Sequence, residues 1–402
     1  MPADRRLAAL GVLLAIPIFG IGFGEVVRPA NATGHFTREV IAFGLDWPVS
    51  FAFAPDGRIF FSERFSGSIR VIVDGQLSLE AVGSVPVVTN GEQGLLGLAL
   101  DPDFNTSPWV YVYHTYFSAS LNRDANRVVR VSADPGSPRT EVVLDAIPAG
   151  TVHNGGILGF AADGTLFITT GDAQNVSNSQ DPTSLAGKVL RVNRDGTVPT
   201  NNPFPGSPVF SLGHRNVFGL AFHPLTGLPY ISENGPNQND EVNRIEPARN
   251  YGWPIVTGDA GDPRFVDPVA TYASVIAPTG LAFYTGEANA TLRNDLFLGD
   301  WNRGILQRLE LASPDFDQVI GTEEVDRFGA AGILDVETGP DGSIYVSTPD
   351  AIYRMSATGN PPNGLGGTGS LGLTSIAIIA GVLAVAVAVL GVRLFRGGRR
   401  RR

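Results

Sequence analysis

The sequence contains no cysteine, so disulfide bonds and thiol chemistry are both excluded. This absence does not assign the protein to a cellular compartment. A chain of 402 residues buries a core large enough to be stable without disulfide bonds. The compartment must therefore be inferred from other parts of the chain.

Positive charge is also scarce. The formal net charge is −10, and residues 393–402 alone contribute six arginines, which leaves −16 for the rest of the chain. So acidic a surface repels a polyanion, which predicts that nucleic acid is not a partner.

A hairpin pattern occurs six times along the chain. Each copy has an alternating apolar run, a tight turn such as Pro-Asp-Gly, and a second run that ends in a small polar or acidic residue; the copies begin at Val49, Gly94, Gly155, Asn216, Thr279 and Gly332. Alternation around such a turn is typical of a β-hairpin. Six hairpins at roughly forty- to sixty-residue intervals predict six blades. Because radial closure hides sheet edges, we expect an all-β, six-bladed β-propeller over residues 36–357.

The two ends of the chain predict export and a membrane anchor. Residues 1–32 combine Arg5 and Arg6 with an apolar stretch and a small-residue cleavage site, which is typical of a signal peptide; a twin-arginine signal is the alternative. Residues 358–370 form a Gly/Pro linker, residues 371–392 are apolar and long enough to cross a membrane, and residues 393–402 form a basic cytoplasmic tail. The propeller is therefore expected outside the cytoplasm, on a single-pass cell-membrane anchor.

Polar residues gather in the loops of the third and fourth hairpins. His153 opens the third hairpin as Val-His-Asn-Gly-Gly, which in a propeller lies at a mouth of the central channel. A neutral imidazole there can accept a hydroxyl proton near pH 7. The alternative is a histidine that only holds a loop together. His214 and His223 flank a strand and are interpreted as such scaffold residues, and Trp109 and Trp253 are expected to pack between blades.

Several motifs resemble those of the soluble quinoprotein glucose dehydrogenases and aldose sugar dehydrogenases, which use pyrroloquinoline quinone (PQQ). The resemblance covers about residues 44–355, and its motifs are residues 91–97 (GEQGLLG), 101–104 (DPDF), the segment around His153, 212–216 (LGHRN) and 232–254. It implies a propeller enzyme that oxidises an aldose or related sugar and passes hydride to the quinone. The electron acceptor that regenerates the quinone is not indicated.

The resemblance also implies roles for individual residues. His153 falls on the general base, and Arg215 and Asn216 fall on the pair beside the quinone, where a cation stabilises the reduced ring. At the position of Glu92, soluble glucose dehydrogenases have a motif that resembles Gly-Gln-Asn-Gly. The glutamate here therefore implies an altered substrate or cofactor contact.

Calcium is implied at two further places. The carbonyls of Gly235 and Pro236 fall on the ligands of a calcium ion that polarises the cofactor. Glu241 and Tyr251 fall on a second, structural calcium site.

The sequence departs from the family at several basic positions. Gly332 and Leu334 stand where two arginines meet the carboxylates of the cofactor, and Ile157 and Asn302 also replace basic residues. PQQ carries three carboxylates, and burying them without cations is costly. The arginines that offer compensation are Arg64, Arg215 and Arg303.

These departures leave two other functions open. One is a propeller of the same lineage that no longer binds the cofactor and serves as a surface recognition module. The propeller of hedgehog-interacting proteins is such a case, because it resembles this family without acting as a dehydrogenase. The other is a calcium-dependent lactonase, whose channel needs a ring of acids; the sequence offers Glu63, Asp172, Glu233 and Asp300 after strands.

Overall fold

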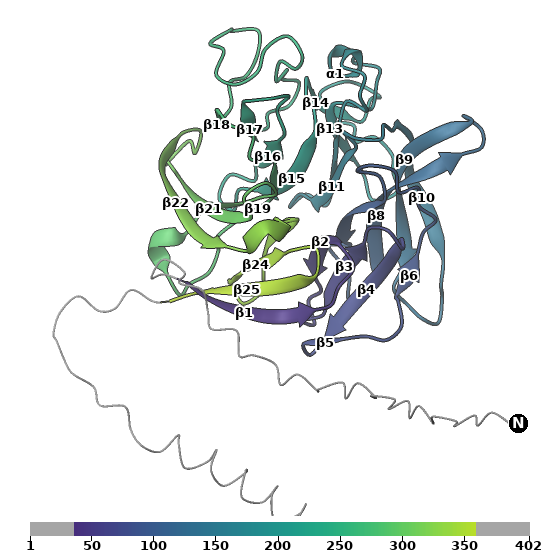
Figure 1. The fold of residues 1–402 in the computed structure, drawn as a ribbon. Helices are drawn as coiled ribbons and strands as arrows, with labels where there is room; N and C mark the ends of the chain where they lie inside the picture. Colours follow the sequence, from purple (N-terminus) through teal and green to yellow (C-terminus); the bar gives the residue numbers. More distant parts are fainter. Residues whose placement is uncertain (1–35, 359–402) are drawn as a thin grey trace, which may run out of the picture. The chain divides into compact units, whose positions relative to one another are not determined.

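The computed structural model describes residues 36–358 and confirms the six-bladed β-propeller (Figure 1). Six inner strands surround the central channel, and each contacts the inner strands of the two neighbouring blades. In chain order these strands, which begin blades 1 to 6, are β2 (Pro48–Phe53), β7 (Leu95–Leu100), β11 (Gly155–Phe160), β15 (Val217–Phe222), β19 (Pro278–Phe283) and β23 (Asp335–Thr338).

The outer strands follow their inner strand in sequence and pair antiparallel. Blade 1 continues with β3 (Ile59–Glu63), β4 (Ser68–Val73), β5 (Gln76–Leu77) and β6 (Gly83–Ser84), and blade 2 with β8 (Trp109–Ser118), β9 (Arg123–Ser132) and β10 (Thr140–Pro148). Blade 3 continues with β12 (Leu166–Thr170), β13 (Lys188–Val192) and β14 (Val209–Leu212), and blade 4 with β16 (Pro229–Glu233), β17 (Asp240–Arg244) and β18 (Ala270–Tyr272). Blade 5 continues with β20 (Leu296–Asp300), β21 (Ile305–Leu311) and β22 (Val319–Arg327), and blade 6 with β24 (Ile344–Ser347) and β25 (Ala351–Ala357). The short helices are α1 (Ser177–Gln180), η1 (Ala290–Leu292) and η2 (Gly329–Ala331).

The first strand of the described chain closes the ring. β1 (Phe36–Phe43) pairs with β25, so the outermost strand of blade 6 comes from the N-terminal side of the domain, as Figure 1 shows. Because one sheet joins both ends of the domain, the blades cannot separate without breaking this pairing.

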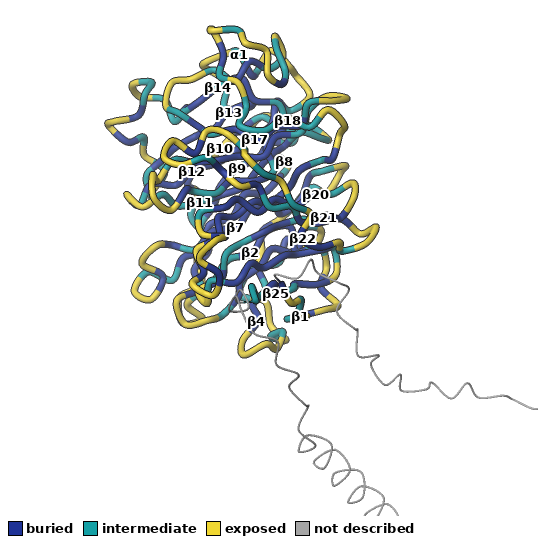
Figure 2. The backbone as a smooth tube through the Cα atoms, turned by 90° about the vertical axis from the view of Figure 1, so that its left-hand side faces the viewer, coloured by how far each residue is buried: buried dark blue, intermediate teal, exposed yellow. Residues whose placement is uncertain are grey.

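Glycines let the inner strands approach one another closely. A Cβ added to Gly97 would collide with the carbonyl of Gly156 in the next blade, and one added to Gly280 would collide with the backbone of Val336. The inner strands are mostly buried, whereas many of the exposed residues lie in the loops and on outer strands such as β10 and β22 (Figure 2). The functional groups must therefore be carried by the loops at the strand ends.

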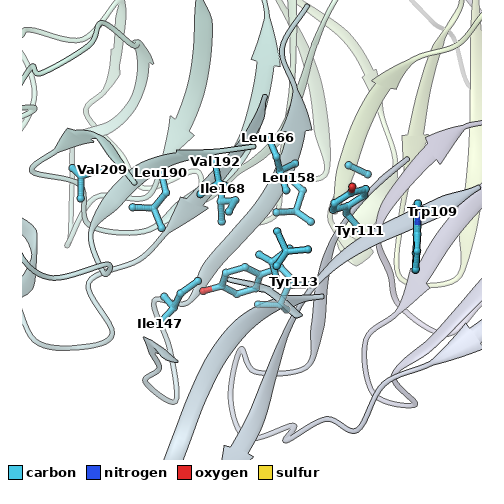
Figure 3. Close-up of a cluster of buried hydrophobic side chains, with 14 residues drawn as sticks. Trp109, Tyr111, Tyr113, Ile147, Leu158, Leu166, Ile168, Leu190, Val192 and Val209 are labelled. Atoms are coloured by element: carbon cyan, nitrogen blue, oxygen red, sulfur yellow. The ribbon is translucent and has the colours of Figure 1, made fainter. Parts of the chain in front are cut away.

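The core between blades 2 and 3 supports one of these loops. Trp109, Tyr111 and Tyr113 pack there against Leu158 and other apolar side chains of blade 3 (Figure 3), which confirms the packing role predicted for Trp109. The hydroxyl of Tyr113 donates a hydrogen bond to the carbonyl of Asn154, 3.0 Å away. Asn154 follows His153 directly, so core packing fixes the chain at that residue.

The predicted terminal segments lie outside the described residues. These are the signal peptide (1–32), the linker beyond residue 358, the membrane helix (371–392) and the basic tail (393–402). Within residues 36–358, no helix is long and apolar enough to cross a membrane.

Candidate active site

A cavity of about 360 Å³ opens at the channel end where the inner strands begin. Its lining includes six of the residues predicted from sequence: Arg64, Glu92, His153, Arg215, Asn216 and Gly235. The loops that carry them come from blades 1 to 4 and are far apart in the chain. Ring closure therefore brings these residues into one site.

His153 lies in this cavity with an acidic partner. Its Nδ1 is 2.8 Å from Oδ1 of Asp172, and its side chain is 18% exposed. Its backbone has φ 60°, a conformation that non-glycine residues rarely adopt. The His153 N–H donates to Oε2 of Glu92, 2.7 Å away, and its carbonyl accepts from Ala173 N–H. Contacts from two blades thus hold the strained residue in place.

Asp172 is itself fixed by several donors. Its side chain is 1% exposed, Oδ2 accepts from Nε1 of Trp253 at 2.9 Å, and Oδ1 also accepts from the backbone N–H of Gln174 at 2.8 Å. An ionised Asp172 requires His153 to carry its proton on Nδ1. We infer that Nε2 is then free to act as a base.

Arg215 supplies a half-buried cation beside this pair. Its N–H donates to Glu233, its Nη1 donates to the carbonyl of Asn234, and its guanidinium lies 5.4 Å from the ring centroid of Trp253. Its Nε is buried and has no hydrogen-bond partner among the described residues. Burial lowers the pKa of Arg215, although Asp172 and Glu233 partly offset the effect. The site therefore has a positive charge that its own acids only partly compensate.

Asn216 and Glu92 connect three blades. Oδ1 of Asn216 accepts from the N–H of Gly155, and its Nδ2 donates to Oε2 of Glu92 at 3.3 Å. Since the same carboxylate oxygen holds the N–H of His153, Glu92 orients the histidine loop. Glu92 also lines the cavity, as its predicted role in substrate contact requires.

The opposite wall is aromatic. The ring centroids of Trp47 and Trp301 are 5.4 Å apart, and the guanidinium of Arg64 lies 5.4 Å from the Trp47 ring and 4.7 Å from that of Phe65. Arg64 donates to the carbonyls of Gln93 and Gly91. Burial lowers its pKa, so this second cation is also only partly compensated.

The positions that lack basic residues differ in their surroundings. Gly332 has φ 74°, and an added Cβ would lie 2.5 Å from the Trp301 ring, so the aromatic wall occupies the space of a side chain there. Leu334 lines the cavity. Ile157 is buried in the core between blades 3 and 4, and Asn302 donates to the carbonyl of Val275.

Arg303 is not among the residues that line this cavity in the described structure. Its guanidinium forms an ion pair with Asp300, with Nη2 2.7 Å from Oδ2. A role as a cofactor contact would require this pair to open. Arg64 and Arg215 are therefore the arginines in position to contact a ligand in the cavity.

The residues predicted to bind calcium lie around a small adjoining void of about 10 Å³. Its lining includes Gly235, Pro236, Glu241 and Tyr251. Oε1 of Glu241 accepts from Gly258 N–H at 2.6 Å, and burial, followed by repulsion from Glu233, raises its pKa to about 7. The Tyr251 hydroxyl donates to one backbone group and accepts from another, so its carbonyl is the oxygen left for a metal.

The four acids considered for a lactonase do not form a ring of free ligands. Each already binds a neighbouring side chain: Glu63 to Arg70, Asp172 to His153, Glu233 to His214 and Asp300 to Arg303. In the described part of the chain, no three His, Cys, Asp or Glu side chains group into a metal site. This arrangement does not favour the lactonase alternative.

A family model for glucose/sorbosone dehydrogenases matches residues 45–354. The chain belongs to this family. Quinoprotein glucose dehydrogenase B of Acinetobacter calcoaceticus is 34% identical over 289 residues, which cover 64% of this chain and 59% of that protein. Aldose sugar dehydrogenase YliI of Escherichia coli K12 is 29% identical over 351 residues, which cover 79% of this chain and 91% of that protein.

Solved structures of family members share the fold. The PQQ-bound aldose sugar dehydrogenase of Streptomyces coelicolor superposes with a TM-score of 0.72 and 31% identity, and the match covers 81% of this chain and all of that one. The resemblance stated from sequence motifs is thereby confirmed.

Two residues of the site were not recognised as partners from the sequence. Asp172 was considered only as a lactonase ligand, and Trp253 only as a packing residue, but together they anchor His153. Asp172 follows the second strand of the hairpin that His153 opens, so hairpin geometry alone could have paired them. Nothing local in the sequence links Trp253, which is 81 residues away from Asp172.

Proposed function

We propose that this protein is a dehydrogenase that oxidises the anomeric hydroxyl of an aldose or related sugar, with PQQ as its bound oxidant. The observation that carries the proposal is the His153–Asp172 pair, whose Nδ1 and Oδ1 atoms are 2.8 Å apart, with His153 lining a cavity that is also lined by the half-buried Arg64 and Arg215. Relatives described as quinoprotein glucose dehydrogenase and aldose sugar dehydrogenase, and the PQQ-bound structure, support the same chemistry.

The lining of the cavity fits an anionic, flat cofactor. The unpartnered Nε of Arg215 is a buried donor that an oxygen of such a group would satisfy. An anion would also compensate the charges of Arg64 and Arg215, whose pKa values burial lowers. Trp47 and Trp301 add apolar surface. Arg64, Arg215 and Asn216 are thus the residues that would hold the cofactor.

When bound, PQQ would supply the acceptor for the hydride that leaves the sugar carbon. Nε2 of His153 takes the proton of the sugar hydroxyl as this carbon is oxidised. Asp172 accepts a hydrogen bond from Nδ1–H, which keeps its proton, and the carboxylate stabilises the resulting imidazolium; Trp253 keeps this carboxylate in place. Leu96, Phe218 and Leu334 line the same cavity and keep water from the reacting atoms.

The proposal includes calcium at the carbonyls of Gly235 and Pro236 and at the site of Glu241 and Tyr251. The shape of the turn supports it, because Oδ1 of Asp240 accepts from Gly235 N–H at 2.7 Å while Oδ2 binds two N–H groups of blade 5. A hard cation prefers such preformed oxygen ligands.

The proposal also includes a place outside the cytoplasm, on a membrane anchor. Its support is the sequence alone: an apolar segment at residues 371–392 followed by six arginines. A protease-accessibility assay on intact cells would test it. Digestion of the propeller only after lysis would contradict the proposed location.

The function is tested by titrating the purified protein with PQQ and calcium while following cofactor absorbance and reduction of a dye by a panel of aldoses. We expect dye reduction only when quinone and calcium are both present. Absence of quinone binding at roughly tens of micromolar would contradict the proposal. It would favour the surface recognition module. The loss of the two cofactor-binding arginines, at Gly332 and Leu334, would then reflect the loss of cofactor binding.

A further inference from the structure

A second cavity, of about 390 Å³, lies at the end of the channel where the inner strands finish. All six inner strands contribute to it, so it is a product of the closed ring. Most of its lining residues are apolar, among them Phe53, Phe160, Phe222 and Phe283, although polar atoms are also exposed on its wall. None of its lining residues belongs to the candidate active site. Its volume is in the range of pockets that bind small molecules.

One ionisable side chain lines this cavity in the described structure, that of Glu337. Its carboxylate has no hydrogen bond or ion pair to any of residues 36–358. Asp335, two residues earlier on β23, lies on the same face of the strand. Both oxygens of Asp335 are used, because Oδ2 accepts from Phe51 N–H at 3.1 Å and Oδ1 from Val336 N–H at 2.9 Å. Asp335 thus joins blades 6 and 1, whereas Glu337 is left facing the cavity.

The chemistry of this lining discriminates between ligand charges. A carboxylate among apolar walls is costly without a partner, and burial together with Asp335 raises the pKa of Glu337 well above its usual range. An anion would add a second negative charge, and a neutral molecule would gain one hydrogen bond. A cation with an apolar body would satisfy both the carboxylate and the wall.

We propose that this cavity binds a small organic cation, such as a quaternary or protonated amine, with Glu337 as its charge partner and the phenylalanine side chains as its apolar contacts. The faces of aromatic rings favour such cations. Since burial together with Asp335 raises the pKa of Glu337, a permanent cation that pairs with this group shifts it toward the ionised carboxylate.

The test uses the full-length protein and isothermal titration with choline and with 3,3-dimethylbutan-1-ol, which has the same shape without the charge. We expect choline to bind at least tenfold more tightly than the alcohol. In two buffers of different ionisation enthalpy, choline binding should show proton release, and its affinity should increase with pH because the pKa of Glu337 is raised. The alcohol should show neither effect.

Glu337→Gln keeps the side-chain volume and should abolish both the preference for choline and the proton release. Glu287→Gln is the matched control, because that side chain is 94% exposed and is not among the residues that line the cavity, and it should change nothing. Ala52→Leu fills part of the cavity and should weaken both ligands equally, which gives a second test if Glu337→Gln does not fold.

Three results would overturn the proposal. The first is no saturable binding of choline by the wild-type protein. The second is equal binding of choline and the alcohol, which would leave only an apolar pocket. The third is unchanged choline affinity in Glu337→Gln or Ala52→Leu.

Discussion

The two walls of the active-site cavity are built differently. The wall from blades 3 and 4 is polar, and hydrogen bonds cross between blades there: His153 and Asn216 both donate to Glu92 of blade 2, and the Asp172 N–H donates to the carbonyl of Arg215. The wall from blades 5, 6 and 1 is aromatic and apolar, with Trp301, Leu334 and Trp47. The proposed proton transfer involves the polar wall, whereas the proposed cofactor contacts come from both walls, through Arg215 and Asn216 on one side and Arg64 on the other. The two positions that lack the family's paired arginines, Gly332 and Leu334, both lie on the aromatic wall.

Each wall is also held rigid by a different cause. On the polar wall, the φ 60° backbone of His153 is maintained by the acceptor oxygen of Glu92. On the aromatic wall, Trp301 lies where a side chain at residue 332 would stand, so packing fixes its position. Removal of the proposed base from the polar wall should therefore alter the rate, whereas a change of charge on either wall should alter the affinity for the cofactor.

The largest effect is expected from His153→Gln. A general base contributes typically 10²- to 10⁴-fold to the rate, and glutamine cannot replace it, although it keeps a polar group near Asp172. Thermal melts should shift by no more than a degree or two, because a large cooperative domain has a large unfolding entropy. Initial rates and melts of the quinone-loaded protein give the measurement. A variant that melts several degrees lower but keeps wild-type activity would make His153 a scaffold residue.

A second histidine, His114, is paired with a cation and not with an acid. His114 is fully buried, its Nε2 accepts from Arg127 at 3.0 Å, and burial together with that arginine lowers its pKa to about 4. Because the folded state keeps His114 neutral, the stability it contributes is present above about pH 6.5 and is lost as the pH falls toward 4. The loss should reach on the order of 3 kcal/mol.

Melts of the wild-type protein and of His114→Gln between pH 4 and pH 7 would measure this loss. Glutamine offers both a donor and an acceptor but does not titrate, so the variant should lose less stability across this range. Equal pH dependence of the two proteins would show that His114 does not account for it.

Arg215→Gln should weaken quinone binding by roughly 10- to 100-fold, because it removes a charge-assisted contact from the polar wall. Arg303→Gln is its matched control. Since Arg303 pairs with Asp300 and does not line the cavity, its removal should change affinity by less than about twofold. A larger loss from Arg303→Gln than from Arg215→Gln would show that Arg303 leaves Asp300 to bind the cofactor. Both affinities come from the absorbance titration.

The sequence predicted what depends on short stretches of chain. Alternation around six turns predicted the blades, because a hairpin is specified by residues close in sequence. The resemblance of whole motifs predicted His153, Arg215 and Asn216, and the structure brings all three to one cavity.

Contacts that depend on ring closure could not be predicted from the sequence. The Trp253–Asp172 hydrogen bond joins loops of different blades. Arg303 was predicted to contact the cofactor from its position in the sequence, but in the structure it pairs with Asp300. The same limit applies to Gly332. The sequence shows only that an arginine is missing there, whereas the structure shows that the ring of Trp301 occupies the space a side chain would need.

The smallest effect is expected from converting part of the aromatic wall back toward a basic one. Leu334→Arg places a guanidinium in the cavity, where one more charged contact to a carboxylate of the quinone is worth about 1 to 2 kcal/mol, or roughly tenfold in affinity. Its control is Gly332→Ala, which has no charge and is strained by φ 74° and the Trp301 ring, so it should lower the melting temperature without tightening the cofactor. The absorbance titration measures both variants. If Leu334→Arg leaves the affinity unchanged, then no carboxylate of the cofactor faces this wall, and the aromatic side has been remodelled for something other than an anchor.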